Sequence, residues 1–465
     1  MRHFQKTAVS LAAAQVAFMW SAAAFAQTAP APAPAAKAET IVVTGQRAAL
    51  QSAQKRKQDS DEVVDSIVAD DIGKLPDRSV TEVLQRIVGV SMDRTMSRGD
   101  PEHFSVEGSG VIIRGMTFTR SELNGRDSFS ANSGRSLSFE DVPPELLAGV
   151  DIYKNPSAEQ IEGGIAGVIN LRTAMPFDFK SSKFGLTVEG TKSTLRDKTE
   201  PSVSIMGSNR WDTELGQFGA LFDYARSKSA TRTDSMQVDA YYPTDVTSTK
   251  WFPKALGWRT MEFDRDRTGT YGALQWKKDN LESALTLFNS RYKFEWNENA
   301  IFSQNSPKNS VIGSDAVWSD SGALLSGTMT NPTDGGIAMD TDTRYANRAS
   351  NTRDLTWNLQ WKPNDRWTLT SDVQVIKSKT EGFDSTVATG LLMPKQKIDL
   401  TGSFPKIDFD AADLAHLADP ANYFWAFTME NVDKSKANQK AWKGDARYKF
   451  DDPVLVDFRF GLRLT

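Results

Sequence analysis

The sequence predicts a compact α/β domain followed by an antiparallel transmembrane β-barrel that is incomplete in this chain. Three observations carry this prediction. From about residue 183 onward, apolar and polar residues alternate with period two in segments of about 8–12 residues. Tight turns and long polar connections follow one another between these segments. Ahead of them, a stretch of about 120 residues mixes one helix signal with short apolar runs.

The first 26 residues have the pattern of a secretory signal peptide. Arg2 and Lys6 give a basic start, and an apolar core follows from Val9 to Trp20. Ala24-Phe25-Ala26 has the form of an A-x-A cleavage site, so we expect cleavage after Ala26 and export from the cytoplasm. A retained membrane helix is the alternative. Cleavage removes Arg2 and Lys6 and changes the formal net charge from −4 to −6.

Composition argues against several functions. The chain has no cysteine and three histidines, His3, His103 and His416, which stand apart. The chain therefore has too few histidines for a histidine-based metal site or a Ser-His-Asp triad to be expected. We predict no enzyme, no metal and no cofactor. The mildly acidic net charge lacks the positive excess that is typical of nucleic-acid-binding proteins. No apolar run of 18 residues follows the signal, which leaves a soluble periplasmic protein or an outer-membrane barrel.

Three short segments follow the signal. Residues 27–38, QTAPAPAPAAKA, form a proline-stiffened spacer. Residues 39–46, ETIVVTGQ, are a β-prone run with no neighbouring strand to pair with. Such a run is either an unpaired strand or a segment that adds to the sheet edge of a partner. Residues 47–60 are polar and charged, and we expect them to be mobile.

Residues 61–180 are predicted to form the α/β domain. Ser79 and Glu82 make a capping box at the start of a helix over 80–87. Turn residues such as Asn124-Gly125 and Asn155-Pro156 divide the rest. The expected strands are the apolar runs Val111–Ile113, Val150–Tyr153 and Val168–Leu171.

Residues 181–465 are predicted to contribute about nine barrel strands. Leu355, Trp357, Leu359 and Trp361, for example, alternate with polar residues. The predicted tight turns are Lys277–Asn280, Pro363–Asp365 and Asp451–Pro453, and the predicted long loops are 227–265, 295–350 and 379–438. Short periplasmic turns and long external loops are typical of outer-membrane barrels. The aromatic residues beside the tight turns predict an interfacial girdle, namely Trp276, Trp361, Trp367, Tyr448 and Phe450.

The order of motifs resembles that of the TonB-dependent outer-membrane receptors, in which a plug domain closes the barrel. The box Thr40-Ile41-Val42-Val43-Thr44-Gly45 looks like their TonB box. The segments that resemble the plug are VTEVLQRIVGV (80–90), Ile113-Arg114-Gly115, Asn124-Gly125-Arg126 and the stretch 142–176 with IYKNPSAEQIEGGIAGVINLRT. The sequences YKNPSAEQIEGG and TAMPFD most resemble those of the Caulobacter–Xanthomonas branch of this family. Many members of that branch are associated with oligosaccharide uptake.

The resemblance implies a partner and a mechanism. TonB, driven by an inner-membrane motor complex, would take the box as an added strand and pull on the plug. The glycines Gly163, Gly164 and Gly167 could in principle cradle a phosphate, but Val168 and Ile169 follow where a phosphate loop needs Lys and Ser or Thr. We therefore expect them to form backbone corners. Glu162 is expected either to pair with Arg114 or a wall arginine, or to be solvated.

Ligand capture is expected on the external loops and the apex of the plug. Aromatic faces beside polar groups suit sugar rings, although an iron–siderophore ligand is the alternative. The candidate ligand-contact residues are Arg98, Asp100, Arg126, Trp251, Trp258, Trp318, Tyr423 and Trp425, with Tyr241, Tyr242, Trp296, Phe424 and Asn124 also available. We expect the mature protein in the outer membrane, in contact with its lipid.

The strand count bears on the length of the chain and on its class. A ninth strand would run outward, whereas plugged transporters use 22 strands, so we expect the chain to be a truncated record of a longer barrel. Two other classes stay open as alternatives, an outer-membrane lipase or protease and a soluble periplasmic glycan-binding β protein. An enzyme has no use for the box and the spacer, and a soluble protein does not explain the plug motifs or the asymmetry between short turns and long loops.

Overall fold

The computed structural model describes residues 44–69, 75, 79–94, 107–131 and 137–465. The chain divides into two compact units, Met1–Thr44 and Gly45–Thr465, and all of the described residues except Thr44 belong to the second. The predicted signal peptide, the spacer and residues 39–43 of the box lie outside the described residues. No helix in the described part is both long and apolar enough to cross a membrane.

The first described element differs from the expected one. We expected Thr44 and Gly45 to extend the β-prone box and residues 47–60 to be mobile, but helix α2 covers Thr44–Asp59. Its sequence, TGQRAALQSAQKRKQD, is rich in Ala, Gln, Lys and Arg, and these are among the strongest helix formers. Basic Arg56 and Lys57 in its last turn also suit the negative end of the helix dipole.

The α/β domain is built on a five-stranded sheet with the order β1-β6-β7-β4-β5. β4 and β7 are parallel, and the other pairs are antiparallel. The bounds are β1 Val64–Val68, β4 Thr119–Leu123, β5 Arg126–Asp127, β6 Leu147–Tyr153 and β7 Gly167–Thr173. A separate two-stranded sheet joins β2 (Val90–Asp93) and β3 (Ser109–Ile113). The apolar runs predicted as strands are therefore confirmed.

The predicted helix is present as α3, which covers Val80–Gln85. The Ser79 side chain accepts a hydrogen bond from the Glu82 backbone N–H at 3.2 Å, as the capping-box pattern requires. Val80, Val83 and Leu84 are fully buried in a core that also contains Val150 and Leu171. Three short 3₁₀ turns, η2 (Phe139–Asp141), η3 (Pro144–Leu146) and η4 (Pro176–Asp178), lie between the α/β domain and the long strands of the rest of the chain.

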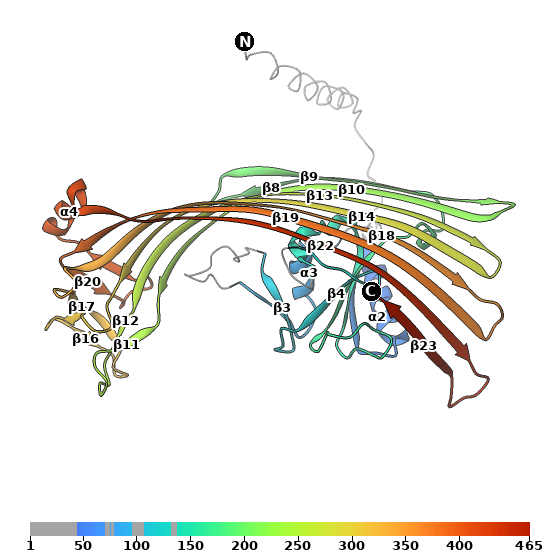
Figure 1. The fold of residues 1–465 in the computed structure, drawn as a ribbon, viewed down its shortest axis with the longest axis horizontal. Coiled ribbons are helices and arrows are strands. Elements are labelled where there is room, and N and C mark those ends of the chain that lie inside the picture. The colour runs from blue at the N-terminus through green and yellow to red at the C-terminus, as the bar shows by residue number, and fades with distance from the viewer. Residues whose placement is uncertain (1–43, 70–74, 76–78, 95–106, 132–136) are drawn as a thin grey trace, which may run out of the picture. The chain divides into compact units, whose positions relative to one another are not determined.

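The remainder of the chain forms a curved nine-stranded sheet (Figure 1). Its order is β23-β22-β19-β18-β14-β13-β10-β9-β8, so each strand pairs with its neighbours along the chain in antiparallel register. The bounds are β8 Lys183–Ser193, β9 Lys198–Thr213, β10 Gly216–Val238, β13 Ala255–Lys278, β14 Leu281–Gln304, β18 Ile337–Trp361, β19 Trp367–Met393, β22 Tyr423–Lys449 and β23 Asp457–Leu464. The predicted strand number is confirmed, and β8 and β23 each have one neighbour in this sheet.

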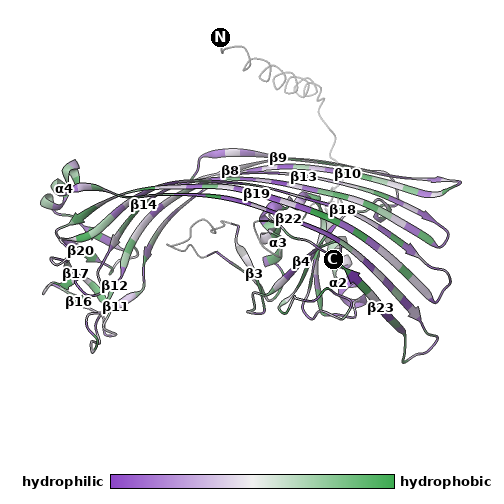
Figure 2. Cartoon of the chain, in the orientation of Figure 1, coloured by the Kyte–Doolittle hydropathy of each residue, from purple (hydrophilic) through white to green (hydrophobic). Residues whose placement is uncertain are grey.

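The two faces of this sheet differ, as the alternation predicts. Hydrophobic and hydrophilic residues follow one another along the long strands in Figure 2. Outward residues such as Phe222, Leu274 and Trp357 are exposed, whereas the inward face packs against the α/β domain. Inward Leu221, Tyr271 and Phe288 belong to the same hydrophobic core as the α/β domain.

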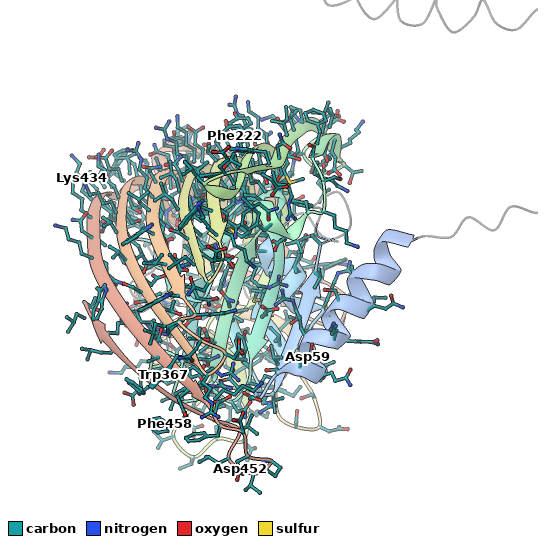
Figure 3. The ribbon with its side chains drawn as sticks, turned by 90° about the vertical axis from the view of Figure 1, so that its right-hand side faces the viewer. Asp59, Phe222, Trp367, Lys434, Asp452 and Phe458 are labelled. Atoms are coloured by element: carbon teal, nitrogen blue, oxygen red, sulfur yellow. The ribbon has the colours of Figure 1, made fainter. Side chains whose placement is uncertain are left out.

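Aromatic side chains gather where the strands meet the tight turns. Trp367 packs edge-on against Tyr448, with ring centroids 4.9 Å apart, and Trp211 stacks on Phe218 at 6.2 Å. Figure 3 shows Trp367 and Phe458 close to the turn that contains Asp452. Most of these rings are half-buried, and the interfacial girdle stays a prediction.

The long loops are shorter than predicted. We expected loops at 227–265, 295–350 and 379–438, but the strands continue into all three ranges, and the connections are 239–254, 305–336 and 394–422. The period of two persists there because charged residues occupy the outward positions. Glu262 and Asp264, for instance, alternate with the buried Met261 and Phe263. The polarity of these segments therefore indicates strands that project beyond the apolar band, and not irregular loops.

The shortened connections fold into a layer with its own core, which we call the loop layer. It contains β11 Tyr241–Pro243, β12 Trp251–Pro253, β15 Val311–Ile312, β16 Val317–Trp318, β17 Leu324–Thr330, β20 Gln396–Asp399, β21 Lys406–Asp408, α4 Ala411–Ala418 and the 3₁₀ turn η5 Pro420–Asn422. Phe252, Leu324, Met329 and Ile398 are buried together in it. Figure 1 shows this layer at the end of the sheet opposite the tight turns.

Candidate functional site

The candidate site is the contact between the α/β domain and the inward face of the sheet, which we call the inner wall. The Asn124-Gly125 pair forms the tight turn between β4 and β5, and both residues have positive φ, 53° and 74°. This is the backbone of a type I′ hairpin. The Asn124 side chain accepts from the Thr173 N–H at 2.9 Å, which fixes the hairpin against β7.

The hairpin directs Arg126 at the inner wall. Its Nε and Nη2 donate to the Asp372 carboxylate of β19 at 2.8 and 2.6 Å. The two side chains are 19% and 14% exposed. A forked guanidinium–carboxylate pair of this kind fixes both distance and orientation, and it can be broken because it is partly hydrated.

A second contact buries a carboxyl group of the α/β domain. Asp141 of η2 accepts from Ser350 Oγ on β18 at 2.8 Å, and its backbone oxygen accepts from Ser290 Oγ on β14. Burial raises the pKa of Asp141 to about 6, with the neighbouring Glu140 adding to the effect, against the hydrogen bond from Ser350. The Asp141 carboxyl therefore holds a proton more readily when the α/β domain is packed against the inner wall.

A third contact centres on Arg267 of β13. It donates to the Glu140 backbone oxygen, and its Nη2 donates to Glu107 Oε2 at 2.5 Å. Burial alone would raise the pKa of Glu107, but the charges of Arg267 and Arg265 outweigh it and lower that pKa. Glu107 is therefore an ionised group of the α/β domain that faces two arginines of the inner wall.

The glycines of EGGIAG form backbone corners. Gly163 has a φ of 119° and Gly167 a φ of 150°. A Cβ on Gly167 would lie 2.6 Å from the Tyr153 backbone oxygen, and one on Gly164 would lie 2.8 Å from the Gly167 oxygen. Ile113-Arg114-Gly115 makes a similar corner, since Ile113 is buried and Arg114 and Gly115 have φ of 53° and 82°. The gating role predicted for these residues stays a prediction.

Of the alternatives for Glu162, the ion pair with Arg114 is not formed, and the exposed Glu162 side chain fits the solvated alternative. Arg114 donates to the Lys154 backbone oxygen at 3.5 Å. The backbone oxygen of Glu162 accepts from Arg120 Nη1 at 2.6 Å, and Arg120 also pairs with Asp127. The two positions are on different turns, so the spacing of the motifs did not show which arginine lies beside the glycines.

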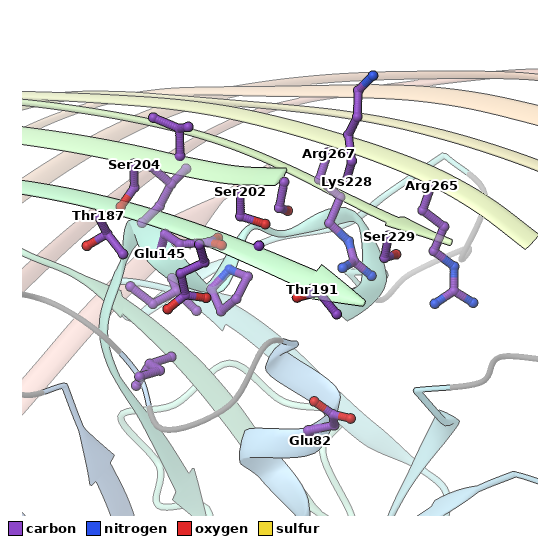
Figure 4. A pocket seen from close by; sticks show the side chains of 18 of the residues that line it. Glu82, Glu145, Thr187, Thr191, Ser202, Ser204, Lys228, Ser229, Arg265 and Arg267 are labelled. Atoms are coloured by element: carbon purple, nitrogen blue, oxygen red, sulfur yellow. The ribbon is translucent and has the colours of Figure 1, made fainter. Parts of the chain in front are cut away.

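A cavity of about 780 Å³ separates the α/β domain from the wall over β8, β9 and β10. Figure 4 shows Thr187, Ser202 and Ser204 of the lining near Glu145, with Ser229 farther along on the side of Arg265. The domain thus contacts β13 to β19 through these polar groups and packs on Leu221 of β10, and the cavity lies beside these contacts. Small polar side chains in such a cavity can bind water, and they leave room for the α/β domain to move.

An arginine–aromatic cluster lies on the inner wall toward the loop layer. Phe263 stacks on Phe294 with ring centroids 5.6 Å apart, and the Arg344 guanidinium lies 4.8 Å from the Trp296 ring centroid. Arg344 also pairs with Asp384, and Arg259 pairs with Glu298, both among buried side chains. The cluster combines ring faces with fixed cations.

The predicted ligand-contact residues are dispersed. Arg98 and Asp100 lie outside the described residues, and Arg126 faces Asp372. Trp258 and Trp318 pack against the core of the loop layer, and the Lys250 ammonium lies 4.9 Å from the Trp318 ring centroid. The exposed ones are Trp251 at 41%, Tyr423 at 37% and Trp425 at 64%. Trp296, named with them as an external aromatic residue, is buried in the wall cluster.

Sequence reasoning missed the wall partners, among them Asp372, Ser350, Arg267, Arg344 and Glu298. Asp372 and Ser350 occupy inward positions of β19 and β18 where other inward residues such as Gln374 are polar too, so alternation did not single them out. His416 is not a ligand candidate, because its Nε2 lies 2.9 Å from the Leu392 backbone oxygen. His103 lies outside the described residues, and within the described ones no group of His, Asp and Glu is arranged to hold a metal.

The α/β domain packs against the inward face of the curved nine-stranded sheet. Residues 56–168 match the family described as the TonB-dependent Receptor Plug Domain. The α/β domain therefore matches the plug domains of the TonB-dependent receptors, and the nine-stranded sheet lies outside the matched residues. From here we call the α/β domain the plug.

Individual relatives are distant. The chain is 25% identical over 225 residues to the hemophilin receptor of Acinetobacter baumannii, which covers 44% of this chain and 20% of that protein. The chain thus aligns with about a fifth of the length of this relative. A variant of the ferric enterobactin receptor PfeA from Pseudomonas aeruginosa is 13% identical, with 88% of this chain and 62% of that chain covered and a TM-score of 0.37. The siderophore receptor PirA from Acinetobacter baumannii is 10% identical, with 86% and 80% covered and a TM-score of 0.31.

Proposed function

We propose that this chain belongs to a TonB-dependent outer-membrane receptor for the active uptake of a substrate too large or too scarce for porins. The observation that carries the proposal is how the plug is held. Breakable polar contacts such as Arg126–Asp372 hold it, and a cavity with hydroxyl groups along part of its lining borders it. A domain that must close a wide barrel and then move needs both features.

The energy for that movement would come through the box. The outer membrane has no ATP, so a periplasmic partner has to do the work. Residues 40–43 would add as a strand to a sheet edge of TonB. Thr44 and Gly45 begin helix α2, so a pull on the box would unwind this helix first. Glycine near the helix start lowers the cost of that step.

An oligosaccharide is the substrate that we favour. Trp251, Tyr423 and Trp425 are exposed at the loop layer, where ring faces could stack on sugars and neighbouring polar groups could bond hydroxyls. The sequence YKNPSAEQIEGG supports membership in the Caulobacter–Xanthomonas branch, in which oligosaccharide uptake is common. The predicted signal peptide supports the outer membrane as its location.

An iron chelate is the second candidate. The wall cluster of Arg259, Arg344 and Trp296 combines cations with an aromatic face, and this combination suits an anionic aromatic chelate. The distant relative named as a hemophilin receptor points in the same direction. Trp296 and Arg259 are buried, so this site would require the plug or loops to shift.

The test is an uptake assay in the source bacterium with the gene deleted and restored. Val43→Pro removes one backbone donor from the box, and Ala33→Pro in the proline-rich spacer is the matched control. We expect Val43→Pro to bind labelled oligosaccharide normally and to lose uptake, while Ala33→Pro keeps both. Ferric siderophores tested in parallel decide between the candidates. Uptake that continues without TonB would contradict the proposed mechanism.

A further inference from the structure

Arg265 of β13 lines the cavity beside the plug and keeps two donor atoms without a partner. Its side chain is 2% exposed, and its Nη1 lies 3.3 Å from Glu107 Oε1. Among the described residues, none accepts a hydrogen bond from the buried Nε and Nη2 of Arg265. These two nitrogens form one edge of the guanidinium, the same edge with which Arg126 binds Asp372. That edge of Arg265 therefore suits an anion that the described part of the chain does not supply.

The carboxylates next to Arg265 are already engaged by other donors. Both oxygens of Glu107 accept from Arg267, at 3.2 and 2.5 Å. Glu140 Oε2 accepts from the Tyr292 hydroxyl at 3.4 Å. The charge of Arg265 is thus partly balanced by the plug, whereas the directional bonds of its Nε–Nη2 edge remain to be made. Buried charged donors are seldom left in this state unless a ligand or water completes them.

A row of hydroxyl groups lies beside Arg265 on the neighbouring strand. Strand register places Ser229 of β10 opposite Arg265, with Ser227 and Thr231 two residues to either side on the same inward face. Opposite side chains on one face of a sheet have Cβ atoms about 5 Å apart, and diagonal ones about 7–8 Å. Ser227 Oγ and Thr231 Oγ1 are also buried, and no described residue bonds them. Figure 4 shows Ser229 and Arg265 on the same side of the cavity, away from Glu145.

The other end of the cavity is acidic. Asp223 of β10 is 5% exposed and lies six residues before Ser229, or about 20 Å along the strand. Glu145 also lines the cavity, and its charge acts on Asp223. A ligand with a negative group would therefore be oriented, with that group at Arg265 and its neutral part toward Asp223.

The lining also selects the class of ligand. None of the described residues that line the cavity is aromatic. The rings next to Arg265, Phe263 and Phe294, lie against its guanidinium, with their centroids 5.9 and 5.4 Å from Cζ. The cavity thus offers a forked donor pair and hydroxyl groups, and not a free ring face for an aromatic chelate. Its volume of about 780 Å³ is typical of a small-molecule site.

We propose that Arg265, Ser227, Ser229 and Thr231 bind a carboxylate-bearing sugar unit, such as a uronic acid, of the transported oligosaccharide. The inference rests on the proposed uptake function and narrows its substrate to acidic oligosaccharides. The sugar carboxylate takes the Nε–Nη2 edge of Arg265, because two coplanar oxygens match two parallel donors. Serine and threonine hydroxyls both donate and accept, so they exchange hydrogen bonds with the sugar hydroxyls.

The experiment measures which oligosaccharides the purified full receptor retains. The probes are a pool of short uronate oligosaccharides and the same pool after carboxyl reduction, which turns each carboxylate into a neutral hydroxymethyl group. We expect the wild type to retain a uronate roughly tenfold better, or more, than its reduced form. R265Q and R265K should lose this preference, since lysine keeps the charge but not the forked edge. The matched control is R366Q, which removes an exposed arginine at a tight turn and should keep the preference.

A second variant leaves Arg265 and its contact with Glu107 in place. S227A/T231V removes two hydroxyl groups, and we expect it to weaken uronate retention several-fold. Heat-modifiable migration in gels checks that each variant is folded. The proposal is overturned if the wild type retains no uronate, if it retains the reduced pool equally well, or if every Arg265 and hydroxyl variant keeps the preference.

Uptake measured in the same cells separates this inference from the proposed function. TonB-dependent import of a neutral, carboxyl-reduced oligosaccharide in preference to its uronate would contradict the acidic-sugar site and leave the uptake function standing. A uronate that is retained through Arg265 but never imported would support the site and contradict the uptake function.

Discussion

Arg126 and Asp372, 246 residues apart in the chain, form a forked ion pair that joins the plug hairpin to the inner wall of β19. Asn358 Nδ2 also donates to Asp372 at 3.1 Å, so the carboxylate is held from two sides. The pair thus depends on a hairpin turn in one domain and on a strand register in the other.

Breaking this pair should loosen the plug. We expect Asp372→Asn to lower the stability of plug seating by about 1–3 kcal/mol, because Arg126 would keep its charge in a partly buried place. Vancomycin sensitivity of cells would report the leak. The exchanged double variant Arg126→Asp with Asp372→Arg should recover much of the loss. The exposed pair Arg366–Asp451 is the control, and its loss should have little effect.

The pH dependence of plug seating should follow Asp141. Its pKa is raised from 3.8 to about 6, so the seated plug binds a proton more tightly than the released one. The stabilisation is fully present below pH 3.8 and is lost as the pH rises through 6, and it amounts to about 3 kcal/mol. Asp141→Asn should flatten this part of the profile. Hydrogen exchange over 139–146 in denaturant, corrected for intrinsic rates, would measure it, and an equally steep profile in the variant would contradict the assignment.

Substituting Gly167 should destabilise the plug. An alanine there combines a φ of 150° with a Cβ 2.6 Å from the Tyr153 oxygen. We expect a loss of about 2 kcal/mol or more, measured as a lower denaturant midpoint for plug exchange. Gly207 is the control, because a Cβ at this position meets nothing within 4 Å. Similar midpoints for Gly167→Ala and Gly207→Ala would show that the corner is not strained.

The loop layer should unfold independently of the plug. Leu324 is fully buried in its core, and Leu324→Ala should cost the layer about 2–5 kcal/mol. Hydrogen exchange should rise over 311–330 and stay unchanged over 147–173, with ligand binding reduced. Leu414→Ala on α4 is the control, since Leu414 is 55% exposed. Faster exchange in both regions would instead indicate one cooperative unit.

The sequence by itself determined the elements whose causes are local. Ser79 and Glu82 fixed the start of α3, Asn124-Gly125 fixed the hairpin, and the period of two identified the nine strands. In each case the signal and the structure lie within a few residues of each other. Local chemistry also explains helix α2, whose strong helix formers outweighed the β-prone run before it.

Only the tertiary structure decided which of these elements meet. Asp372, Ser350 and Arg267 became plug contacts because sheet curvature brought the inward face of three different strands against the plug. The outward neighbours were likewise decided by register, which places Lys379 opposite Lys436. Such pairings join residues that are far apart in the chain, and alternation gives the face of a side chain but not its neighbour, because a shift of two residues preserves the face and changes every partner.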